Sequence, residues 1–262
     1  MSLCLVLKYK RELIYKMFRY QIIIEYDGTN HSGWQSQKNA KSIQKEIEKT
    51  FSRILKKKIK INGSGRTDAG VHSKNQSAHF DYINIILDKH KLISSVNYFL
   101  NKKNISIKKI VKKNMNFHAR YSANERVYEY IILNRVAPPI LDKNKVWHLR
   151  SKLNIKLLKK AAKKLIGTHN FNAFRSSNCQ AKSPIRTLKT IKVTKKKEKI
   201  IFILRSKSFL KNQVRSIIGC LKYVGENKWN IKDLEKVLKS KNRNYCAPPA
   251  PAQGLYLSRI IY

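Results

Sequence analysis

Several short, mainly apolar stretches of the chain end at residues that favour turns. The clearest is 19–26, which is rich in β-branched and aromatic side chains and stops at Asp27-Gly28. This composition, followed by a turn, is typical of a β-strand. The same reasoning predicts further strands at 58–62, 76–82, 105–112, 126–133, 186–194, 199–206 and 255–261.

Other stretches repeat apolar residues every three or four positions, which is typical of a helix with one buried face. Residues 43–55 have this spacing and follow Ser42, a residue type that caps helix N-termini. A helix from there to about residue 57 is expected. Asn154 begins a second pattern of this kind, which Gly167 is expected to end. Similar spacing predicts helices around 92–100, 210–224 and 230–239.

Strands and helices mix in both halves of the chain in a similar order, which predicts an α+β protein built from two α+β halves. We expect one half at 18–115 and the other at 116–262, packed tightly because no low-complexity linker separates them. Residues 1–17 hold only a five-residue apolar patch, which is too short for a secretory signal. They are expected to be an N-terminal extension outside the chemistry, with Met17 as an alternative start.

The charge of the chain indicates a polyanionic partner. Its 262 residues include 57 Lys and Arg against 15 Asp and Glu, a formal net charge of +42. Such a surface attracts nucleic acid, because neutralising phosphates releases condensed counterions. The alternative is a compositional bias, because Lys, Ile and Asn all have AT-rich codons. No apolar run approaches the roughly 20 residues that span a bilayer, so no membrane partner is expected.

The cysteine and histidine positions predict no metal site. None of the four cysteines stands in a Cys-x-x-Cys pair, and the histidines show no repeated ligand spacing. The cysteines also form no dense disulfide framework, so a reduced, cytoplasmic compartment is expected.

The stretch from Gly63 to His72 is the strongest candidate for chemistry. Its three glycines within eight residues let the backbone turn sharply, but it lacks the Gly-Lys-Ser/Thr of a P-loop and does not fit the dinucleotide-binding spacing. It carries Arg66 and Asp68 two positions apart, and a guanidinium near a carboxyl group favours the ionised form. An ionised carboxylate can act as a nucleophile or as an electrostatic stabiliser. The alternative is a turn aspartate that bonds its own backbone.

Residues 65–72, Gly-Arg-Thr-Asp-Ala-Gly-Val-His, resemble the signature of the tRNA pseudouridine synthase A family. The resemblance covers roughly residues 18–262, and its motifs follow in the family's order. The further stretches that resemble family motifs are Glu25 to Gly28 with Gly33 to Gln35, Phe117 to Ala123, Arg126 to Tyr130, Phe209 to Gly219, and Gly254 to Leu257.

The resemblance implies a fold and a set of site residues. The implied fold has two ferredoxin-like halves that form one continuous mixed, largely antiparallel sheet flanked by helices, with the active-site cleft between the halves. Asp68 matches the catalytic aspartate, and Tyr128 matches the tyrosine that lies against the target base. Arg215 is implied to pair with Asp68, and Arg66 to contact RNA phosphate or brace the flipped nucleotide.

The resemblance also implies an activity and its partners. The family isomerises uridine to pseudouridine at positions 38–40 of the tRNA anticodon stem-loop, works as a homodimer and needs no cofactor, because the reaction is an isomerisation. Two alternatives stay open: an enzyme of the same family with other target uridines, and a tRNA-binding protein without catalysis. A P-loop-like nucleotide-binding protein is disfavoured by the missing P-loop lysine.

Overall fold

The strands of the protein join into one sheet. The computed structural model describes residues 17–37 and 40–262, so the expected extension, apart from Met17, lies outside the described residues. Ten strands form the sheet within this part of the chain. In chain order they are β1 (Phe18–Tyr26), β2 (Asn62–Gly63), β3 (His72–Tyr82), β4 (Ile105–Lys113), β5 (Glu125–Asn134), β6 (Trp147–Leu149), β7 (Gly167–Asn170), β8 (Ile185–Lys196), β9 (Lys199–Ser206) and β10 (Leu255–Ile261).

The main path through the sheet runs β4-β1-β3-β10-β5-β9-β8-β7, with β2 paired to β3 and β6 paired to β5. Strands far apart in sequence meet where β10 runs parallel to β3, with Tyr256 opposite His72 and Leu257 opposite Ser73. The β5–β6 pair is also parallel, and the other pairs are antiparallel. The mixed, largely antiparallel sheet is therefore confirmed. The ferredoxin-like character of two halves and the boundary at 115/116 stay predictions.

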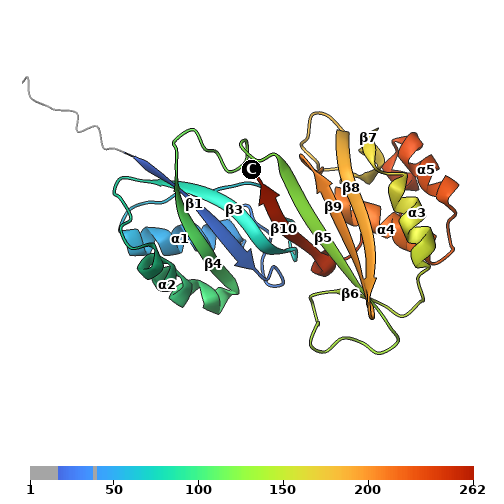
Figure 1. The fold of residues 1–262 in the computed structure, drawn as a ribbon, viewed down its shortest axis with the longest axis horizontal. Coiled ribbons are helices and arrows are strands. Elements are labelled where there is room, and N and C mark those ends of the chain that lie inside the picture. The colour runs from blue at the N-terminus through green and yellow to red at the C-terminus, as the bar shows by residue number, and fades with distance from the viewer. Residues whose placement is uncertain (1–16, 38–39) are drawn as a thin grey trace, which may run out of the picture.

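Five α-helices flank the sheet in the described residues. Figure 1 shows α1 and α2 beside β1, β3 and β4 at one end, and α3, α4 and α5 beside β7, β8 and β9 at the other. Among the residues described, no helix combines the length and apolar character needed to cross a membrane. The helices are α1 (Ile43–Leu55), α2 (Lys89–Leu100), α3 (Ile155–Lys163), α4 (Gln213–Gly225) and α5 (Ile231–Ser240).

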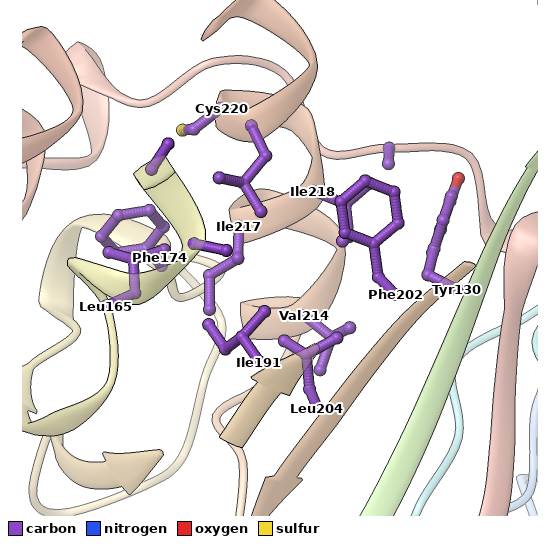
Figure 2. Close-up of a cluster of buried hydrophobic side chains, with 14 of the residues drawn as sticks. Tyr130, Leu165, Phe174, Ile191, Phe202, Leu204, Val214, Ile217, Ile218 and Cys220 are labelled. Atoms are coloured by element: carbon purple, nitrogen blue, oxygen red, sulfur yellow. The ribbon is translucent and has the colours of Figure 1, made fainter. Parts of the chain in front are cut away.

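The buried side chains fall into two clusters. One lies within residues 20–110, and the other, larger one draws on residues 128–257 together with Val71. Figure 2 shows part of the larger cluster, where Val214 of α4 lies next to Leu204 of β9, and Ile217 of the same helix belongs to the same cluster. Because these apolar residues fix which face of α4 is buried, they also fix where the polar residues of that helix project.

The prediction of a strand at 58–62 is wrong except at its last residue. Ile59 and Ile61 are buried as a strand pattern would require. However, the amide of Ile59 donates to Ser52 Oγ at 2.8 Å, and that of Ile61 donates to Glu48 Oε1 at 2.9 Å. Side chains of α1 thus take the bonds that a neighbouring strand would supply, so that the segment packs under the helix without joining the sheet.

Two expected helix boundaries also differ, and one expected helix cap is not formed. The third helix ends at Lys163, and Gly167, with a φ of 111°, begins β7 instead. The helix expected from 210 begins at Gln213, because Asn212 adopts a left-handed conformation with a φ of 64°. Ser42 precedes α1 as expected, yet its buried hydroxyl has no hydrogen-bond partner among the described residues.

Candidate active site

The glycine-rich stretch connects β2 to β3 and is anchored along its length. The amide of Ser64 donates to Ser77 O at 2.8 Å, and Gln76 Nε2 donates to Gly65 O at 2.7 Å. Further along, the hydroxyls of Tyr26 and Thr67 share a hydrogen bond of 2.8 Å. These bonds tie the loop to two neighbouring strands, so its backbone has a defined course up to Asp68.

The segment after β1 packs closely against the same loop at two glycines. A Cβ at Gly28 would lie 2.1 Å from Val71 O, closer than any real side-chain contact. At Gly33, where φ is 92°, a Cβ would lie 2.5 Å from Thr67 O. Only glycine allows the turn and the loop to approach this closely, which explains why the sequence places glycines at both positions.

Asp68 stands half-buried in the middle of the loop. Its carboxylate makes no hydrogen bond to any residue in the described part of the chain. Burial raises the pKa of the Asp68 carboxyl above its ordinary value, and the charges of Arg215 and Lys211 oppose that rise. A partly desolvated carboxylate with its oxygens unoccupied is free to interact with a substrate atom.

Neither of the two arginines considered around Asp68 forms an ion pair with it among the described residues. Arg66 is exposed and is not one of the cations that act on the pKa of Asp68, although the sequence spacing suggested it. Arg215, on α4, was expected to pair directly with Asp68, but within the described residues the two form no ion pair. Its Nε donates to Ala250 O at 2.7 Å and its Nη1 to Asn212 Oδ1 at 3.3 Å. Arg215 therefore acts on Asp68 through space.

Tyr128 lies between Phe209 and the loop that carries Asp68. Its side chain is buried, and its ring meets Phe209 edge-on with centroids 5.1 Å apart. The hydroxyl lies 4.0 Å from the position that a Cβ at Gly65 would take. Burial and the neighbouring Asp68 raise the pKa of Tyr128 well above its ordinary value, so the hydroxyl keeps its proton at neutral pH.

Sequence reasoning missed two residues of the site. Lys211, whose charge acts on Asp68, stands in the 209–219 motif, but nothing marks it among the many lysines of the chain. Arg126 begins the 126–130 motif and is buried. An arginine within a predicted strand of mostly apolar side chains is the signal that could have identified it, because a buried charge needs partners.

The described residues also form a hollow outside the Asp68 loop. The hollow is lined by Lys58, Lys60, Asn62 and Asp81, and its volume is about 320 Å³. It does not include Asp68 or Tyr128, and the expected cleft between the halves stays a prediction. Within residues 17–37 and 40–262, no three side chains of His, Cys, Asp or Glu gather as metal ligands.

Comparisons with known proteins place the chain among relatives of known type. A family model described as tRNA pseudouridine synthase matches residues 22–122 and 161–262. The tRNA pseudouridine synthase A of Pelagibacter ubique (strain HTCC1062) is 54% identical over 246 residues, which cover 94% of this chain and 100% of that protein. The tRNA pseudouridine synthase A of Neorickettsia sennetsu (strain ATCC VR-367 / Miyayama) is 43% identical over 244 residues, 93% of this chain and 100% of that protein.

A solved Cbf5-Nop10-Gar1 complex matches 77% of this chain and 54% of its own chain, with 13% identity and a TM-score of 0.30. That similarity is too low to support an argument. The family match and the two relatives extend over most of the chain and include the loop that carries Asp68. On that basis, the chain belongs to the tRNA pseudouridine synthase family.

Proposed function

We propose that the chain isomerises uridine to pseudouridine at positions 38–40 of the tRNA anticodon stem-loop, with Asp68 as the catalytic carboxylate. The observation that carries this proposal is the environment of Asp68. Its carboxylate is half-buried, lies next to Tyr128 and is influenced by two cations that are not ion-paired to it. Such a carboxylate is available to a substrate, whereas one locked in an ion pair is not.

The reaction breaks the bond between uracil N1 and C1′ of the ribose and forms a bond from C1′ to C5. C5 loses a proton and N1 gains one, so the product has the atoms of the substrate and no redox cofactor is needed. Asp68 assists as a nucleophile or as a stabiliser of the positive charge that develops on the sugar. Both roles need the ionised carboxylate, which Arg215 and Lys211 favour.

The remaining site residues bind the flipped nucleotide. The target base must leave its stack to reach Asp68, and an aromatic ring can receive it. Tyr128 offers that ring, with a hydroxyl that stays protonated and can donate a hydrogen bond or help to move a proton. Arg66, which is exposed on the same loop, binds backbone phosphate, and Arg215 contributes to substrate binding beside its effect on Asp68.

The proposal extends to the partners of the enzyme. The net charge of +42 supports binding of the tRNA phosphates. We propose a cytoplasmic homodimer in which the anticodon arm of one tRNA reaches across both subunits. Gel filtration with and without tRNA tests the dimer, and a monomer in both conditions would refute it.

Mapping of pseudouridine in total tRNA, from cells with and without this gene, tests the activity. Loss of pseudouridine confined to positions 38–40 is the expected result. Loss at other positions would indicate an enzyme of the same family with different targets. If pseudouridine is the same with and without the gene, a non-catalytic tRNA-binding protein becomes the better interpretation.

A further inference from the structure

Arg126 is a buried cation at the start of β5, with 9% of its surface exposed. Desolvation lowers the pKa of its guanidinium below the ordinary value. Among the residues that the structure describes, no carboxylate lies within ion-pair distance of it. Burying an unpaired charge is costly, so its donors must be satisfied in another way.

The donors of Arg126 are satisfied mainly by backbone carbonyls from three separate segments. Each bond comes from one of the two terminal nitrogens of the guanidinium, so a single planar group holds all three segments. Nη1 donates to Lys207 O at 2.7 Å and Ala123 O at 3.3 Å, and Nη2 donates to Arg120 O at 2.6 Å, Ser64 O at 3.0 Å and Ser64 Oγ at 3.4 Å.

Two of the three segments joined in this way carry residues of the site. Ser64 begins the loop that presents Asp68, and Lys207 begins the connection from β9 to α4, which carries Phe209 and Lys211. Arg126 itself lies two residues before Tyr128 on the same face of β5, because side chains alternate along a strand. One guanidinium therefore links the Asp68 loop to the strand of the substrate tyrosine.

We propose that Arg126 is a positioning residue, which holds the Asp68 loop in place relative to Tyr128; this inference rests on the proposed function. Its burial leaves it no access to RNA phosphate. Its bonds go to backbone carbonyls, whose positions follow the main chain, so it sets the course of the loop. A lysine has a single ammonium and cannot reach all of these acceptors in one plane.

The test compares Arg126→Lys with a matched control, Arg19→Lys. Arg19 binds the same segment nearer its start, since its Nη1 donates to Met115 O at 2.6 Å and Phe117 O at 2.8 Å, whereas Arg126 binds Arg120 and Ala123; Arg19 forms no bond to the Asp68 loop among the described residues. We expect Arg126→Lys to lower kcat about 100-fold, because small misplacements of reacting groups have effects of that size. We expect its Kd for tRNA, and the salt dependence of that Kd, to stay at the wild-type values.

Arg19→Lys is expected to lose thermal stability to a similar extent but to keep its kcat. Rates are measured at saturating tRNA and at a temperature where both variants are folded, and they are expressed per tRNA-binding site. Equal losses of kcat in the two variants would overturn the inference in favour of a general structural role. A weaker Kd with a shallower salt dependence and an unchanged kcat would overturn it in favour of a phosphate contact. If the wild-type protein forms no pseudouridine in tRNA, the proposed function fails, and this inference fails with it.

Discussion

Arg215 acts on the pKa of Asp68, yet its guanidinium is held by other groups, with Nε donating to Ala250 O at 2.7 Å. The charge is therefore fixed near the carboxylate without occupying its oxygens. Direct pairing would stabilise the ionised form more strongly, but it would also compete with the substrate for the carboxylate.

The first prediction concerns the pH profile of Arg215 variants. Arg215→Met removes a cation that opposes the raised pKa of Asp68, so that pKa rises further and the acidic limb of kcat/KM moves to higher pH. Arg215→Lys keeps the charge, so the limb should stay in place while kcat falls about tenfold through the lost anchor at Ala250. Lys222→Met, on the same helix, serves as the control. An acidic limb unmoved in the Met variant would refute the through-space effect.

The second prediction separates the ring of Tyr128 from its hydroxyl. Tyr128→Phe keeps the edge-on packing against Phe209, so affinity for tRNA should be retained. The hydroxyl stays protonated in the site and is the group able to donate to the substrate, so kcat should fall about 10- to 100-fold if it takes part in proton transfer. Single-turnover rates measure this. An unchanged rate would show that Tyr128 contributes only its ring.

The third prediction is that Asp68→Asn stabilises the protein at neutral pH. The pKa of Asp68 is raised in the folded state, so its ionised form is less favourable there than in the unfolded chain. The variant should therefore melt at a higher temperature, and the difference should vanish as the pH falls below about 4, where the carboxyl group is protonated in the unfolded chain too.

Asp81→Asn is the matched control for this stability measurement. Asp81 is also an aspartate, but it pairs with Arg19 through two bonds of 2.7 Å. Loss of that pair should lower the melting temperature, the opposite of the effect at Asp68. A lower melting temperature for Asp68→Asn at neutral pH would contradict the desolvation that is argued for Asp68.

The fourth prediction concerns the origin of tRNA affinity. If phosphate contacts dominate, Kd should rise steeply with salt, by about 1,000-fold or more between roughly 50 and 200 mM for six or more contacts. Arg66→Met should make the logarithmic slope shallower by about one, because the phosphate contact proposed for this exposed residue would be lost. A flat salt dependence would mean that the charge of +42 is compositional bias.

The sequence predicted the strands and helices that bury one face, because such burial leaves a regular pattern of apolar residues. The strand at 19–26 and the helix from residue 43 are both present. The segment 58–62 shows the limit of that reasoning. Its alternating isoleucines are buried, but their amides are bonded by Ser52 and Glu48 of α1, and no local pattern predicts that contact.

The sequence likewise predicted residues of the candidate site but not the contacts that hold them. The motif resemblance singled out Asp68 and Tyr128, and the structure brings these two residues close together. It could not indicate that Arg215 would be held by Ala250, since that depends on how the segment before β10 packs on α4. The buried position of Arg126 depends likewise on the carbonyls of Ser64 and Lys207, which lie 62 and 81 residues away along the chain, so sequence spacing does not reveal it.

The central claim is that this chain forms pseudouridine in tRNA through Asp68. The most direct measurement maps pseudouridine at positions 38–40 in tRNA from cells that lack the gene and carry either the wild-type chain or Asp68→Asn. Asparagine is nearly isosteric but uncharged, so the variant should bind tRNA normally and restore no pseudouridine at these positions, whereas the wild-type chain restores it. Substantial pseudouridine in cells that carry Asp68→Asn would contradict the catalytic role of Asp68.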